Sequence, residues 1–454
     1  MHRSLILPLL LSLSSLALPQ EIVQVIQIPL EKLVSDTLNE KVVVAHFIVG
    51  NTYNYIQSNW AKDIILASSK GFDGFALNVG IDNWQPARVA DAYAAAANSG
   101  TAFKLFLSFD MTSLPCAQME DSTILRQYIS NYSQHQSQFS VGGKPMVSTF
   151  SGEQCEFGMP SVDDGWHYAL KNSTSNPVHF IPAFFDLPAT LTPLTVIDGA
   201  FNWNAAWPIG KNNATFDSDN EWIDALNGRD YMAGVSPWFF THYGANSYNK
   251  NFILRGDDWL IANRWELLVQ HRNRISLAQV ITWNDYGESH YVGPIEGMQP
   301  MSQAWTDGFD HQGWLDLIHY YIQVFKTGIY PPPSEDRLFL WARLYPASAT
   351  ARSDAVGIPE HADDTLDYVW AVVFLISPAH VSLSCGASHK TVMLEAGISK
   401  VQLPLISSCN VEASIVRFGI TVVAFKPSGF SFNTDPVVYN FNAFVAASPS
   451  ATLQ

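Results

Sequence analysis

The run KVVVAHFIVG at residues 41–50 is apolar through its interior and rich in Val and Ile. Seven further runs of this texture follow it along the chain, at 73–80, 103–110, 144–150, 178–184, 196–203, 229–238 and 278–285. Strands that are buried on both faces of a parallel sheet have such apolar interiors. The eight runs therefore predict eight buried parallel strands.

The stretches between these runs carry helical periodicity, at 58–71, 87–100, 122–135, 217–228, 257–272 and 314–328. Strands that alternate with helices over nearly 300 residues are typical of the α/β class, here a (β/α)8 TIM-type barrel over residues 41–330. A doubly wound sheet is the alternative. It requires a Gly-rich phosphate turn after the first strand, and HFIVGN at 46–51 is not one.

The texture changes after the Pro-rich stretch PPPSEDR at 331–337. Short apolar or alternating segments follow, separated by Gly, Pro, Asn and Ser, and no long helical pattern remains. This pattern predicts a C-terminal antiparallel β-sandwich domain over residues 337–454.

The first 20 residues have the features of a secretory signal peptide: Arg3, an apolar run from Leu5 to Leu18, and small residues before a cleavage point. We therefore expect a secreted protein, extracellular or in a cell wall. Secretion fits the four cysteines, which we expect to pair as Cys116–Cys155 and Cys385–Cys409, each pair within its own half of the chain. Glycosylation sequons begin at Asn131, Asn172 and Asn213.

The 454 residues include 25 Lys and Arg against 41 Asp and Glu, a net charge of −16. Such an acidic chain is a poor partner for nucleic acid or an anionic membrane. Neither Cys-x-x-Cys nor His-Glu-x-x-His occurs, so we expect no metal and no cofactor. We expect a monomer that acts on a polysaccharide.

The segment ITWNDYGESHYVGPI at 281–295 follows the eighth strand and holds two carboxylates, Asp285 and Glu288. Gly287 permits a turn that brings both to one cavity. Two carboxyl groups flanked by aromatic side chains are what acid/base cleavage of a glycosidic bond requires. The alternative is structural: Asp285 caps a loop and Glu288 is solvated.

Active sites of such barrels collect at the C-terminal ends of the strands. Nine of the 14 Trp lie between 203 and 314, and indole rings stack on the apolar faces of sugars. The candidate substrate-binding residues at or near strand ends are His46, Asn78, Asp110, Trp203, Trp238, His242, Trp283, Asn284, His290 and Tyr291.

Several long motifs in order resemble the fungal α-1,3-glucanases, or mutanases, of glycoside hydrolase family 71. They are VVVAHFIVGNTYNY, DGFALNVG, KLFLSFDM, GVSPWFFTHY, ITWNDYGESHYVGPI and DGFDHQGWLDL. The resemblance implies a secreted, inverting enzyme that hydrolyses α-1,3-glucan of fungal cell walls. It places the family's carboxylates on Asp285 and Glu288, and an acidic residue after the second strand on Asp82.

We expect endo-acting hydrolysis with Glu288 as general acid and Asp285 as general base, and Asp82 as the alternative base. An inverting pair is ~6.5–9.5 Å apart and a retaining pair ~5–5.5 Å apart. A short gap between Asp285 and Glu288 would transfer the base role to Asp82. Two other functions stay open: a cell-wall protein that binds without turnover, and an enzyme acting on another α-glucan such as α-1,4-glucan.

Overall fold

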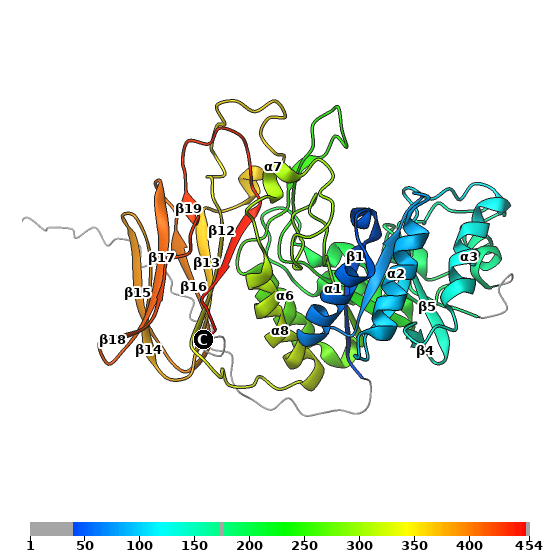
Figure 1. Cartoon of the computed structure of the whole chain (residues 1–454), viewed down its shortest axis with the longest axis horizontal. Helices are drawn as coiled ribbons and strands as arrows, with labels where there is room; N and C mark the ends of the chain where they lie inside the picture. The colour runs from blue at the N-terminus through cyan, green and yellow to red at the C-terminus, as the bar shows by residue number, and fades with distance from the viewer. Residues whose placement is uncertain (1–39, 172–176, 451–454) are drawn as a thin grey trace, which may run out of the picture.

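The computed structural model describes residues 40–171 and 177–450 (Figure 1). The predicted signal peptide and the sequon at Asn172 lie outside the described residues. Within the two described ranges, no helix combines the length and the apolar character that a membrane crossing requires.

A curled sheet of nine strands carries the N-terminal part of the chain. Eight of its strands pair in parallel, and each of the eight predicted ranges overlaps one of them. They are β1 (Val42–Ile48), β2 (Gly74–Val79), β3 (Lys104–Asp110), β5 (Lys144–Phe150), β6 (His179–Phe180), β7 (Gly199–Asn202), β8 (Asp230–Val235) and β11 (Leu277–Val280). The ninth, β4 (Ser140–Val141), pairs antiparallel with β5.

The parallel strands follow the order β6-β5-β3-β2-β1-β11-β8-β7, so β1 is central and pairs with both β2 and β11. The ladder does not continue between β6 and β7. The run predicted at 178–184 forms only a two-residue strand, and Pro182 within it has no N–H to donate to a ladder with β7. Two backbone hydrogen bonds still cross this gap, from Asp198 N to Phe180 O (2.9 Å) and from Phe201 N to Pro182 O (2.8 Å).

Helices follow most of the parallel strands. They are α1 (Gln57–Ser69), α2 (Gln85–Asn98), α3 (Ser122–Tyr132), α4 (Val162–Trp166), α5 (Asp217–Leu226), α6 (Leu260–Gln270), α7 (Gln303–Thr306) and α8 (Gln312–Thr327). Each of the six predicted helical stretches overlaps one of them, and α1, α2 and α8 begin one or two residues before the predicted start. The helical segments after β5 and β6 are short: α4 and η3 (His167–Lys171) follow β5, and η4 (Pro188–Leu191) follows β6.

The C-terminal part forms two antiparallel sheets. One contains β12 (Arg337–Arg343), β13 (Tyr368–Leu375), β16 (Gly397–Pro404) and β20 (Ala443–Ala447). The other contains β14 (Ala379–Cys385), β15 (Ser388–Leu394), β17 (Cys409–Arg417), β18 (Ile420–Phe425) and β19 (Ser431–Phe432). Alternate residues of both sheets, such as Leu340 and Leu383, belong to one buried hydrophobic cluster.

The other face of the first antiparallel sheet packs on α6 and α8, which lie between it and the parallel sheet (Figure 1). Trp259 meets Trp370 with ring centres 5.0 Å apart, and its Nε1 donates to Ala371 O. Trp314 of α8 meets Trp341 of β12 at 6.1 Å. These ring contacts form a continuous aromatic core between the two parts. Burial of such large rings supplies much of the packing energy.

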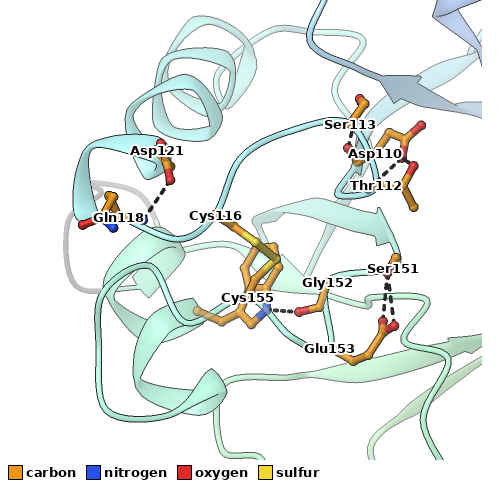
Figure 2. Close-up of a disulfide and its surroundings, with 11 residues drawn as sticks. Asp110, Thr112, Ser113, Cys116, Gln118, Asp121, Ser151, Gly152, Glu153 and Cys155 are labelled. Carbon is orange, nitrogen blue, oxygen red and sulfur yellow. Dashed lines mark hydrogen bonds between the residues drawn. A yellow bond between two sulfur atoms is a disulfide. The ribbon is translucent and has the colours of Figure 1, made fainter.

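Both disulfides pair as predicted, Cys116 with Cys155 and Cys385 with Cys409. The first joins the loop after β3 to the loop after β5, two neighbouring strands (Figure 2). It therefore ties together two loops at the C-terminal edge of the parallel sheet.

A buried ion pair fixes α5, α6 and β8 to one another. Arg264 donates through both terminal nitrogens to the Asp219 carboxylate at 2.6 Å, and neither side chain is exposed. Tyr231 Oη donates to Asp219 Oδ1 at 2.6 Å, and Arg264 Nε donates to Gly234 O at 2.9 Å. Every donor and acceptor of the pair is used, as a buried charge requires.

Arg264→Met should lower the free energy of unfolding by about 3–5 kcal/mol, because it leaves the Asp219 carboxylate buried without its cation. Arg274→Met is the matched control. It removes an Arg–Asp pair with Asp224 that solvent reaches, at a cost of at most about 1 kcal/mol. Urea denaturation of both variants measures the difference, and equal losses would contradict a special role for the buried pair.

Candidate active site

The segment after β11 is held against the end of β1 by the side chain of Asn284, which makes the hydrogen bonds that a strand backbone would make. Asn284 Oδ1 accepts from Ile48 N at 2.7 Å, and Asn284 Nδ2 donates to Ile48 O at 3.1 Å. Trp283 N donates to His46 O at 2.7 Å, and Asn51 Nδ2 donates to Asn284 O at 2.9 Å. The β1–β11 pairing is thereby extended beyond the strand, and the next residue, Asp285, emerges at the C-terminal edge.

A turn over residues 285–290 then places both carboxylates together. Asp285 N donates to Thr282 Oγ1 at 2.8 Å, and Glu288 N donates to Asp285 Oδ1 at 3.2 Å. Thr282 N donates to His290 O at 2.8 Å, which closes the base of the turn. The expected turn is present, although Ser289, with φ of 60°, adopts the left-handed conformation rather than Gly287.

Gly287 is required for a different reason than the one expected. A Cβ at this position would lie 2.4 Å from Tyr243 Oη, which itself donates to Pro300 O at 2.8 Å. The constraint is therefore the close approach of a neighbouring side chain, and not an unusual backbone dihedral angle.

Asp285, Glu288 and His290 bring one oxygen or nitrogen each within 4.8 Å of one another. His290 Nε2 lies 3.0 Å from Glu288 Oε2, and Lys250 Nζ lies 3.4 Å from Glu288 Oε1. The two carboxylates thus lie closer together than the ~6.5–9.5 Å that separates a pair holding a water between base and sugar.

The surroundings give the two carboxyl groups different proton affinities. Burial, and then the charge of Glu288, raises the pKa of Asp285 to about 6. Burial also raises the pKa of Glu288, but the hydrogen bond and charge of His290 and the ammonium of Lys250 outweigh it, and the net pKa lies below its usual value. Asp285 therefore keeps its proton to a higher pH than Glu288 does.

The same three side chains offer ligand atoms of the kind that bind metal ions. However, the Lys250 ammonium already lies against the Glu288 carboxylate, and a second cation there would be repelled. We therefore assign no metal to this cluster.

His46 lies in the interior of the sheet next to this pair. It is 1% exposed, and its Nδ1 accepts from Gln279 Nε2 at 2.9 Å, which assigns the remaining proton to Nε2. That Nε2 has no hydrogen-bond partner within the described residues. Burial, and then the charge of His290, lowers the pKa of His46 to about 3, so the ring is neutral. Trp203 packs edge-on against His46 with ring centres 4.9 Å apart.

Asp110, Asn78 and Asp82 also lie at the C-terminal edge. Asp110 ends β3, and its Oδ1 accepts from Thr112 Oγ1 at 2.6 Å (Figure 2). Burial raises the pKa of Asp110, and the charges of Lys250 and Glu288 also act on it. Asn78 is buried in β2 between Ile48 and Ser108. Asp82 is exposed beyond β2 and accepts from Gln85 Nε2 at 2.9 Å.

Five of the predicted substrate-binding side chains anchor segments around the site. Each is nearly inaccessible or has its polar atoms engaged. Trp283 and Tyr291 are fully buried, Trp238 Nε1 donates to Phe441 O, and the Asn284 amide is bound to Ile48. Both ring nitrogens of His242 face other side chains, Asn251 and Asp354. Polar and aromatic residues at strand ends can thus anchor loops, and contact of these five with substrate stays a prediction.

Sequence reasoning missed three residues of the site: Lys250, Tyr243 and Thr282. Lys250 lies in the polar stretch NSYNKN at 246–251, which reads as an ordinary solvated loop. Only the fold brings it to Glu288, 38 residues away. The sequons at Asn131 and Asn213 are exposed and available for modification.

Gly287→Ala should destabilise the protein by about 1–3 kcal/mol, because the added methyl group overlaps the Tyr243 hydroxyl. Tyr243→Phe removes that hydroxyl and leaves ring carbons 3.4 Å from the new Cβ. Thermal unfolding of the two single variants and the double variant forms a cycle. The double variant should lose less stability than the two single variants lose together. Additive losses of stability would contradict the clash between the new methyl group and the Tyr243 hydroxyl.

Comparisons with known proteins identify the family. A glucan endo-1,3-α-glucosidase from Schizosaccharomyces pombe is 38% identical over 91% of this chain and 96% of its own length. A mutanase from Penicillium rubens is 31% identical over 96% of this chain and 95% of its own length. Among solved structures, a GH99 endo-α-mannosidase from Bacteroides thetaiotaomicron has a TM-score of 0.48 at 11% identity, covering 63% of this chain and 97% of that one.

The sequence profile described as glycosyl hydrolase family 71 matches residues 39–454, which include both the curled sheet and the antiparallel sheets, and the chain belongs to that family.

Proposed function

We propose that the protein is a secreted endo-acting hydrolase that cleaves α-1,3-glucosidic bonds within fungal cell-wall α-1,3-glucan. Family membership and the printed activities of its relatives support this substrate. The observation that carries the chemistry is the pair Asp285 and Glu288, held within one turn at the C-terminal edge of the parallel sheet.

The division of protons in that pair supports distinct roles. A general acid must be protonated before it can donate to the leaving oxygen. Asp285, with a pKa raised by burial and by Glu288 to about 6, holds the proton, while Glu288 is kept ionised by His290 and Lys250. We therefore assign the general acid to Asp285, the reverse of the order expected from the sequence, and Glu288 stabilises the positive charge that develops on the sugar.

An inverting reaction then needs a third carboxylate as the base, since Asp285 and Glu288 are too close to admit a water between base and sugar. We assign this role to Asp82. It follows β2, which is separated from β11 by β1 alone, so their ends are roughly 10 Å apart at strand spacings of 4.7–4.9 Å. Gln85 holds Oδ2 of Asp82 and leaves Oδ1 toward solvent.

Two neighbouring groups are suited to bind the sugar. The Nε2–H of His46 is a buried donor without a protein partner, which a substrate hydroxyl would satisfy. Trp203 lies beside it and retains 8% exposure, so its ring edge reaches the same space. Asp110 and Asn78 lie on the next strands and can accept or donate to further hydroxyl groups.

We further propose that residues 41–330 form a closed (β/α)8 barrel and residues 337–454 a β-sandwich domain. The sequential order of the eight parallel strands and the two hydrogen bonds across the β6–β7 gap support closure. The shared cluster of the two antiparallel sheets supports the sandwich.

Purified protein should release reducing sugar from insoluble α-1,3-glucan and not from α-1,4-glucan, with oligosaccharides among the first products. Asp285→Asn and Glu288→Gln should each reduce kcat by about 10²–10⁴-fold, because each removes a proton or a charge needed in the transition state. Circular dichroism controls for folding. A folded variant that keeps more than about a tenth of the activity would exclude that residue from catalysis.

Inversion at an α-linkage should give β-anomeric reducing ends, which proton NMR detects before mutarotation. Asp82→Asn should abolish this reaction, because no other carboxylate then activates the water. Asp121→Asn changes a half-buried carboxylate that accepts from Gln118 N in the loop before α3, and this control should keep full activity. An initial α-anomer, with activity retained in Asp82→Asn, would show that Asp285 and Glu288 act alone with retention.

A further inference from the structure

The hairpin of β9 (Phe240–His242) and β10 (Asn251–Ile253) lies against the acid/base turn. Phe240 N donates to Glu288 O at 3.0 Å, and Tyr243 N donates to Lys250 O at 2.7 Å. Lys250 precedes β10, and its Nζ reaches Glu288 Oε1 at 3.4 Å. The hairpin therefore determines where the one ammonium group on the Glu288 carboxylate lies.

The outer edge of this hairpin is held by the C-terminal part of the chain. Glu360 N donates to Asn251 O at 3.0 Å, and Ile253 N donates to Glu360 O at 3.1 Å. Asn251 Nδ2 lies 3.2 Å from both Gly357 O and Ile358 O. The residue next to Lys250 is thus fixed on both backbone and side chain by the segment 357–360.

A buried network extends this attachment. His242 Nδ1 lies 2.7 Å from Asn251 Oδ1, and His242 Nε2 lies 3.0 Å from Asp354 Oδ2. The side chains of His242 and Asp354 are 8% and 4% exposed. Asp354 also accepts from the backbone N–H groups of Val356, Gly357 and Tyr439.

The side-chain amide of Asn251 has a defined orientation in this network. Its Nδ2 faces two carbonyl oxygens, which can only accept, so its Oδ1 faces His242. The imidazole of His242 therefore lies between the Asn251 amide oxygen and the Asp354 carboxylate, in contact with both.

We propose that Asp354 of the C-terminal part is a positioning residue for the acid/base pair, acting through His242 and Asn251 to keep Lys250 on Glu288. This inference rests on the proposed function. Lys250 is 54% exposed at its side chain, and an exposed Lys–carboxylate contact contributes little unless its geometry is imposed. The network supplies that geometry, so the C-terminal part completes the catalytic site rather than only flanking it.

The charged and polar groups around Glu288 set the pKa on which the network acts. Six groups face or act on this carboxylate: Asp285, His290, Lys250, Asp110, Tyr243 and His46. Lys250 is the member whose position depends on the hairpin attachment. Its displacement should raise the pKa of Glu288, so that the ionised form is lost at a higher pH.

The test measures the pH dependence of α-1,3-glucan hydrolysis in Asp354→Asn, Lys250→Met and the double variant. Each single variant should move the acid limb of kcat upward by about half to one pH unit, less than the 1–3 units of a fully desolvated ion pair. If Asp354 acts through Lys250, the acid limb of kcat should shift no further in the double variant than in Lys250→Met. An unmoved limb in Asp354→Asn, or additive shifts, would overturn the proposal.

Glu266→Gln is the matched control, because it breaks another ion pair across the same two parts, with Lys400, far from the hairpin. It should lower the melting temperature without moving the acid limb. His242→Gln replaces Asp354→Asn if the latter does not fold, and it should shift the limb in the same direction.

Amide hydrogen exchange gives a readout that does not depend on activity. Residues 243–252 should exchange at least several-fold faster in Asp354→Asn and His242→Gln than in Glu266→Gln. Unchanged exchange would overturn the positioning role even in an active enzyme. Faster exchange in a protein inactive on α-1,3-glucan would instead contradict the proposed function alone.

Discussion

The arrangement of the site depends on one amide side chain. Asn284 hydrogen-bonds both the N–H and the C=O of Ile48, as a neighbouring strand would. Because its partner atoms belong to the central strand β1, the turn that follows inherits the rigidity of the sheet. Asp285 and Glu288 are therefore placed by backbone geometry, and their side chains have few degrees of freedom left to lose in the transition state.

The sequence predicted what depends on local pattern. Apolar runs located all eight parallel strands because both faces of such a sheet are buried, and helical periodicity located the six longer helices. The pattern was less accurate at 178–184, where the regular strand is only two residues long and Pro182 offers no N–H toward β7. The turn at 285–290 was also expected, but its cause was not: Tyr243, distant in sequence, sets the requirement for Gly287.

The substrate-binding residues stay predictions, because the sequence pattern has two physical causes. At the end of a buried strand, a polar or aromatic side chain can face the substrate or anchor the next loop, and both uses favour the same residue types. Trp238 and Asn284 proved to be anchors, whereas His46 retains a free donor. Lys250 carried no local signal at all, since its role arises from a contact between distant segments.

The proton distribution in the pair follows from this asymmetry of contacts. Asp285 Oδ1 accepts from Glu288 N within its own turn, and burial and the charge of Glu288 outweigh the charges of His290 and Lys250 in setting its pKa. Glu288 is equally enclosed, yet it meets His290 from its own loop and Lys250 from the β9–β10 hairpin. Two carboxylates from one short motif thus differ in protonation because His290 of the same loop, and then Lys250 of a second element, hydrogen-bond to Glu288. That element is itself held by Asp354 and residues 357–360, so the chemistry of the parallel sheet draws on both halves of the chain.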